Sequence, residues 1–183
     1  MGRSQSTALS FIRVMCGANN MDCTTLHARA KLLLTCYRRV CWDATGQCEP
    51  FDDEDQEYYR DSNLINALEY LSNFDPASEN ENFENTIRTL FETRWMIGLI
   101  DNAMLRVKEF PDQGEIYFDI LSKCYLTRFK YNEKEILDLV NLERSRYYDR
   151  KKEAILVFGI SLWGKEIPKL KHFLEQCDQD LAV

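Results

Sequence analysis

The polar side chains best suited to binding a ligand are concentrated in residues 144 to 152. Arginine can donate paired hydrogen bonds to a guanine edge, and arginine, lysine, serine and tyrosine all bind phosphate oxygens. Close together on one helical stretch, these residue types favour contact with double-stranded DNA. The candidate DNA contacts are Arg144, Ser145, Arg146, Tyr147, Tyr148, Arg150, Lys151 and Lys152, with Lys134 a short way upstream.

The residues around this cluster predict two short helices joined by a tight turn. Asn132 is a favourable N-cap, and Glu133 and Glu135 place negative charge in the first turn, where the helix dipole favours it. Asn141 is expected to end the first helix, because asparagine tolerates the left-handed conformation that a helix stop needs. A second helix is predicted over about 144–163. The apolar face of the first helix consists of Ile136, Leu137 and Val140.

Such a pair has the layout of a helix-turn-helix, in which the second helix enters the major groove. Arg144 and Arg146 are positioned for base contact, whereas Lys151 and Lys152 lie further along the helix and favour phosphate. A helix over 115–129 is expected to brace the pair and to complete a three-helix core. The competing interpretation is a solvated helical hairpin whose charges only keep the chain soluble.

A longer stretch resembles a known family. The run E-I-L-x-L-V-N-L-E-R-S-R-Y-Y-x-R-K-K-E-A-I, continuing into F-G-I-x-L-W-G, is similar to the C-terminal part of the ArpU-type phage late-gene transcriptional regulators. Those regulators in turn resemble the helix-turn-helix of sigma factor region four, which reads promoter DNA. The resemblance covers about residues 132–164. The family usually has Ser or Thr where this chain has Glu143, and Gly where it has Asn141. The resemblance implies a transcriptional regulator of phage or mobile-element origin.

Composition predicts a globular, all-α protein. The chain of 183 residues is 45% hydrophobic and 29% charged, with 7 Gly and 4 Pro. Its net charge is −7, but the stretch from Arg128 to Lys171 holds eleven Lys or Arg against seven Asp or Glu, a local balance of +4. A basic module beside an acidic body is compatible with DNA binding of modest affinity. No apolar stretch reaches membrane-spanning length, and we expect no membrane partner and a cytoplasmic location.

Neither the cysteines nor the histidines indicate a metal site, a cofactor or an enzyme. The seven cysteines contain no C-x-x-C pair, and there are two histidines. A zinc site from His27, Cys36, Cys41 and Cys48 can be imagined, but the spacing matches no common ligand pattern. Catalytic signatures such as G-x-S-x-G, a phosphate-binding glycine loop or H-E-x-x-H are missing from the sequence. The thiols are those of a reduced, cytoplasmic protein.

Hydrophobic spacing and turn residues divide the chain into three predicted parts. Residues 1–21 are expected to be a flexible or mis-annotated extension, 22–110 a helical domain with an acidic linker at 43–57, and 111–183 the helix-turn-helix domain. The boundary between the last two is the turn cluster of residues 110–114. Further helices are predicted from residue 24 or 25 to about Trp42, over 56–74, over 83–110, and from Pro168 to about Cys177.

An alternative function is a helical adaptor that binds another protein, for example RNA polymerase, with a degenerate helix-turn-helix. The adaptor would use the amphipathic N-terminal helices, whose basic residues are otherwise interpreted as a solvated face. Those basic residues are Arg29, Lys31, Arg38 and Arg39. The long apolar helix over 83–110 could form the seam of a homodimer.

Overall fold

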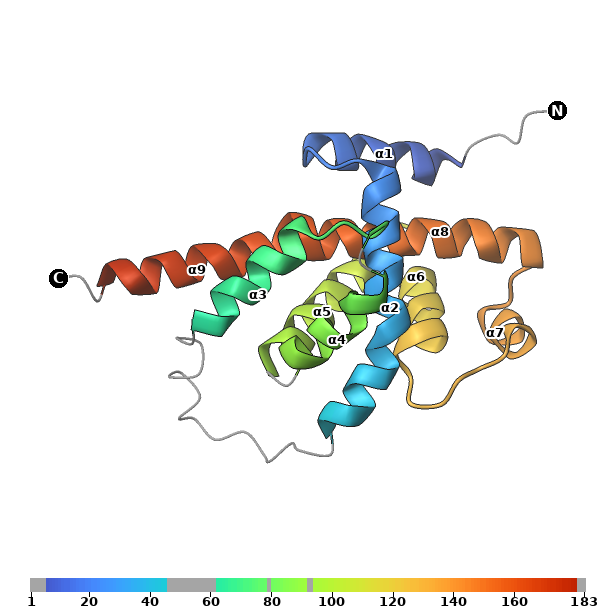
Figure 1. Ribbon diagram of the computed structural model, residues 1–183. Coiled ribbons are helices and arrows are strands. Elements are labelled where there is room, and N and C mark those ends of the chain that lie inside the picture. The colour runs from blue at the N-terminus through green and yellow to red at the C-terminus, as the bar shows by residue number, and fades with distance from the viewer. Residues whose placement is uncertain (1–5, 46–61, 79, 92–93, 181–183) are drawn as a thin grey trace.

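The computed structural model describes residues 6–45, 62–78, 80–91 and 94–180. The regular elements in those ranges are helical and none of them is a strand, which confirms the all-α prediction. The helices are α1 (Thr7–Ala18), α2 (Cys23–Thr45), α3 (Ser62–Asn73), α4 (Asn80–Phe91), α5 (Arg94–Lys108), α6 (Gly114–Leu121), α7 (Glu133–Val140), α8 (Arg144–Ser161) and α9 (Ile167–Asp180) (Figure 1).

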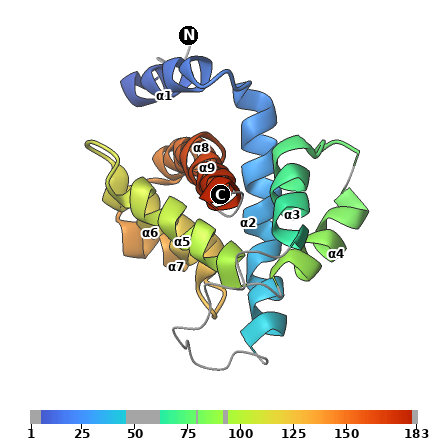
Figure 2. The same cartoon turned by 90° about the vertical axis from the view of Figure 1, so that its left-hand side faces the viewer.

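The last two helices form a central rod. α8 continues through a π-helical turn, Leu162–Glu166, into α9 without leaving right-handed helical geometry. Figure 2 looks nearly along this rod and shows α1, α2, α5 and α6 arranged around it. The π-helical turn ends two residues before Pro168. Proline has no N–H to donate, and its ring crowds the preceding turn of a regular helix. The separate final helix predicted from Pro168 to Cys177 is therefore the second half of a continuous rod.

α2 is the long helix that crosses the rod. Its apolar face is buried, through Leu26, Ala30, Leu33, Leu34, Tyr37 and Val40, with Cys41 partly buried. The two helices approach closely at Gly159 of α8, where an added Cβ would lie 2.8 Å from Leu26 Cγ. A residue without a side chain permits this tight crossing.

The basic residues of α2 bind neighbouring elements rather than forming only a solvated face. Arg29 donates hydrogen bonds to the carbonyl oxygens of Ser72 (3.2 Å) and Phe74 (3.1 Å) at the end of α3. Arg38 donates to the Thr127 carbonyl (2.7 Å), beyond α6. Cations stabilise helix C-termini, where carbonyl groups lack intrahelical donors. α2 thus fastens the ends of two helices that are distant from it in sequence.

One hydrophobic core runs across the predicted domain boundary. Leu34 and Ile100, before the boundary, belong to the same buried cluster as Phe158, which lies after it. The turn at residues 110–114 is present, but α5 before it and α6 after it pack against each other and against α8. The predicted division into two domains is therefore corrected to a turn within a shared core.

The N-terminal segment 1–21, predicted to be flexible or mis-annotated, contains a packed helix. α1 contacts α8, and its Ile12 and Cys16 are buried in the main core. The Ser6 side chain caps the helix by accepting a hydrogen bond from a backbone N–H. A short segment with weak periodicity gains most of its helical stability from the surface that it covers, which its own sequence does not reveal. Residues 1–5 lie outside the described part.

The single long helix predicted over 83–110 is two helices, α4 and α5, with residues 92–93 outside the described ranges. α4 packs against α2, where Glu84 and Arg39 form an ion pair of 2.7 Å. α5 packs instead against α6 and α8. The two helices pack against different neighbours and do not share one axis. The apolar face of α5, considered above as a dimer seam, is buried within the chain.

The helix predicted over 56–74 is described as α3 from Ser62 to Asn73, and residues 56–61 lie outside the described ranges. Its leucines at 64, 68 and 71 are buried, whereas Ile65 is 46% exposed. Adjacent helical residues point about 100° apart, so Leu64 and Ile65 do not both face the core. The acidic linker predicted at 43–57 begins later, because α2 continues to Thr45; its remainder lies outside the described residues.

Within the described ranges, no helix has the length and apolarity needed to cross a bilayer.

Candidate nucleic-acid interface

α7 begins where the sequence predicts. The Asn132 side-chain oxygen accepts a hydrogen bond from the Glu135 backbone N–H (2.9 Å), and the Glu135 carboxylate accepts one from the Asn132 backbone N–H (2.7 Å). This reciprocal capping box satisfies two backbone donors that the first helical turn leaves without partners. The start of the short helix is therefore fixed by local sequence alone.

The turn between α7 and α8 depends on one residue. Asn141 adopts the predicted left-handed conformation, with φ 52° and ψ 48°. Glu143 then occupies the N-cap of α8 in an extended conformation, and its side chain makes no capping hydrogen bond. The direction of α8 is thus set by the backbone of Asn141 and not by a capping side chain.

A small hydrophobic cluster holds this helix pair against α6. It contains one buried residue from each helix, Ile120, Ile136 and Tyr147. The Tyr147 hydroxyl lies 3.1 Å from Cys124 Sγ, and burial together with this contact raises the pKa of Tyr147, so the hydroxyl stays protonated. Leu137, Val140 and Leu142 pack around the cluster. The brace helix predicted over 115–129 therefore corresponds to α6 and the π-helical turn that follows it.

The first turns of α8 expose side chains on their outward face. Figure 1 shows this end of α8, with α7 beside it, at the margin of the molecule. The side chain of Arg144 is 73% exposed, and Tyr148 is 46% exposed. The exposed members of the predicted contact set are Lys134, Arg144, Ser145, Arg146, Tyr148 and Lys152. Arg144 and Tyr148 lie beside the start of α7, whereas Lys152 lies two turns further along α8, close to His27 of α2.

Glu133 links α7 to this leading end of α8. Its carboxylate lies 2.8 Å from Arg144 Nε and accepts a hydrogen bond of 2.7 Å from the Tyr148 hydroxyl. The Tyr148 hydroxyl and the Glu133 charge both raise the pKa of Arg144. Arg144 and Tyr148 are thereby oriented before any ligand arrives.

Three of the predicted DNA contacts are engaged within the chain. Tyr147 is 2% exposed and belongs to the small cluster. The Arg150 side chain is 27% exposed and lies 2.6 Å from the Glu153 carboxylate. Lys151 Nζ lies over the rings of Tyr125 and Tyr147, at 5.2 and 5.7 Å from their centroids. Helical residues three and four positions apart share a face, so these three residues point inward together.

Glu153 was not predicted as a special residue, yet it joins three helices. It is 1% exposed, and its Oε2 accepts hydrogen bonds from the Tyr117 hydroxyl (2.7 Å) and from Arg150 (2.6 Å). Ser6, at the start of α1, donates to the other carboxylate oxygen. A buried carboxylate requires such partners, because desolvation alone is costly. No local signal marks Glu153, since Ser6 and Tyr117 lie far away in sequence.

Carboxylates accompany the exposed cations. By helical spacing, Asp149 shares the outward face of α8 with Ser145 and Lys152. The other exposed carboxylates of the pair are Glu135, Asp138 and Glu143. The four exposed cations at 134, 144, 146 and 152 are therefore nearly balanced by acids. Such a surface suits a few defined contacts better than a dense row of phosphates.

The described residues contain no group of three or more His, Cys, Asp or Glu side chains that could hold a metal ion. Cys36, one of the four residues considered for zinc, is buried in the main core, and Cys48 lies outside the described ranges.

Comparison with protein-family models, with curated proteins and with solved structures finds no match.

Proposed function

We propose that this protein is a sequence-specific DNA-binding transcriptional regulator of phage or mobile-element origin, with the leading end of α8 in the major groove. The proposal is carried by the division of α8 into an exposed, polar leading half and a fully buried rear half. A helix that reads bases must present its N-terminal residues on a rigid support. The rear half of α8 supplies that support.

Each exposed residue has a role that suits its position. Arg146 donates to a guanine edge, and Asp149 accepts from the amino group of a cytosine, the pairings that direct readout favours. Ser145 and Lys152 contact phosphate, as does Lys134 from α7. Arg144 and Tyr148, already held by Glu133, contribute a fixed pair at the groove edge.

The charge of the surface limits its affinity. Each neutralised phosphate contributes roughly 0.9 to the slope of log affinity against log salt. Few cations are exposed, and carboxylates lie among them. We therefore expect modest affinity with a shallow salt slope, and sequence preference that depends on a small number of base contacts.

Selection of bound fragments from random DNA, followed by salt titration of the full chain against the selected duplex, tests the proposal. We expect an enriched sequence and binding that weakens as salt is raised. A palindromic sequence would also indicate a homodimer, because operator symmetry mirrors protein symmetry. Failure to bind any duplex at low salt would contradict the proposal.

A helical adaptor is the second candidate, and one observation favours it. α1 exposes two apolar side chains, Phe11 (53% exposed) and Val14 (68% exposed). Exposed apolar residues on a helix that covers the core suit contact with another protein, such as RNA polymerase. The duplex titration separates the two candidates, because an adaptor would have no affinity for DNA.

A further inference from the structure

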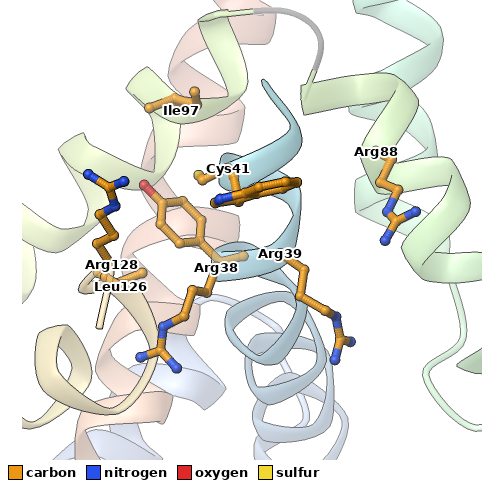
Figure 3. A pocket seen from close by; sticks show the side chains of 9 residues that line it. Arg38, Arg39, Cys41, Arg88, Ile97, Leu126 and Arg128 are labelled. Carbon is orange, nitrogen blue, oxygen red and sulfur yellow. The ribbon is translucent and has the colours of Figure 1, made fainter. Parts of the chain in front are cut away.

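The C-terminal end of α2 lies apart from the leading end of α8 (Figure 1). Side chains there form a second cationic surface. It is a pocket of about 830 Å³. Tyr37, Trp42, Ile97 and Leu126 supply its apolar part. Four arginines complete the lining: Arg38, Arg39, Arg88 and Arg128. Figure 3 shows Arg88 and Arg128 on opposite sides of the two arginines of α2.

Three of the arginines are already oriented. Arg38 donates to the Thr127 carbonyl oxygen (2.7 Å), which fixes the plane of its guanidinium group. Arg39 binds Glu84 through two nitrogens, at 3.0 and 2.7 Å, and Arg88 donates to the same carboxylate at 3.2 Å. A guanidinium group carries five N–H donors, so Arg38 and Arg39 are not saturated by these bonds. Glu84 thus shows that arginines of this surface bind a carboxylate group.

Among the described side chains at this surface, the four arginines lie with two acids, Glu84 and Asp101. Burial raises the pKa of Tyr37, and Cys41 and the charge of Asp101 raise it further. Arg128 is exposed at the rim, and Trp42 is 72% exposed. An incoming ligand therefore meets cations around an aromatic surface.

We propose that this pocket docks an acidic peptide segment of a partner protein, in which carboxylates flank an aromatic or aliphatic side chain. Six of the lining residues are tryptophan, tyrosine or arginine. These residue types dominate the binding energy of protein interfaces. Arginine matches the two oxygens of a carboxylate, and the apolar part accepts the flanked side chain. The backbone of a DNA duplex presents phosphates and sugars, and it would leave the apolar part without a partner.

The proposal does not depend on the DNA-binding function. The pocket residues come from α2, α4, α5 and the segment after α6, and they include none of the exposed residues at the leading end of α8. The two surfaces can therefore be altered separately in the full chain.

Fluorescence anisotropy with a short labelled synthetic peptide, in which Asp and Glu flank a single Phe, tests the pocket. We expect Trp42→Ala to weaken binding by about tenfold or more, as removal of an aromatic anchor does. Arg128→Glu should weaken it at least as much, because it places a carboxylate at the rim. Arg146→Glu, the matched charge reversal at the leading end of α8, should leave peptide affinity within about twofold. Circular dichroism confirms that each variant is folded.

A peptide with Asn and Gln in place of its acids should not bind, and the acidic peptide should bind less tightly as salt is raised. Absence of binding by the acidic peptide would overturn the proposal. Equal losses with Arg128→Glu and Arg146→Glu would overturn it as well, since they would indicate unspecific attraction. If Arg128→Glu weakened duplex binding but not peptide binding, the pocket would be a nucleic-acid contact instead. A loss of duplex binding confined to Arg146→Glu supports the separate DNA proposal and leaves the peptide result unchanged.

Discussion

The two halves of α8 belong to one uninterrupted helix but have opposite environments. In the leading half, residues 144–152, Tyr147 is the residue that is buried. In the rear half, from Glu153 to Ser161, all residues are buried. α1, α2, α5 and α6 surround the rear half, whereas α7 and α6 support the leading half from one side. The difference shows that a helix acquires its role from the elements packed against it.

Side chains of the same charge, four positions apart on α8, have different environments. Asp149 is an exposed carboxylate on the outward face, while Glu153, four positions later, is buried among three hydrogen-bond donors. Arg146 is exposed, while Arg150 is held against Glu153. A step of four residues along the helix therefore separates a surface that can bind a ligand from one that holds the fold together.

The largest expected effect comes from Glu153→Ala. Removing the carboxylate leaves the buried Tyr117 and the partly buried Arg150 without their shared partner, and we expect a loss of about 3–5 kcal/mol in the free energy of unfolding. Urea denaturation measures it. Asp149→Ala is the matched control on the exposed half and should change stability by less than about 0.5 kcal/mol. Equal losses for the two variants would contradict the difference between the halves.

Arg146→Ala should affect binding and not folding. We expect a loss of about 1–3 kcal/mol in the affinity for the selected duplex and relaxed preference at one base position. Anisotropy titrations with selected and random duplexes give both values. An equal loss on both duplexes would remove Arg146 from the residues that read sequence.

Asn141→Val tests the joint that holds the leading half in place. A β-branched residue is strained in the left-handed conformation, and we expect a cost of about 1–2 kcal/mol in the free energy of unfolding. Asn141→Gly should be tolerated, because glycine adopts this conformation without a steric penalty. If Val and Gly gave the same stability, the turn would not depend on the left-handed backbone at this position.

The smallest effect is expected for Lys152→Ala. The side chain is exposed, so stability should change by less than about 0.5 kcal/mol. Affinity should fall alike for all duplexes, and the slope of log affinity against log salt should decrease by about one unit. Salt titrations of the wild-type chain and the variant measure this slope. An unchanged slope would show that Lys152 makes no phosphate contact.

Local patterns predicted much of the candidate site. Asn132 with Glu135 identified the start of α7, and Asn141 identified its end, because capping and left-handed turns depend on residues close together in sequence. The burial of Tyr147 was not predicted. Its partner Cys124 lies in the segment after α6, so helical spacing alone could not separate it from the exposed Tyr148.

By itself, the sequence determined that the chain is helical, where α7 begins and ends, where α8 begins, and which stretch carries the concentrated cations. These features follow from spacing, capping and turn residues within a few positions of one another. Only the tertiary structure decided that α1 covers the rod, that Glu153 joins three helices and that four arginines surround one pocket. Those arrangements depend on residues far apart in the chain, whose meeting is set by the packing of the shared core.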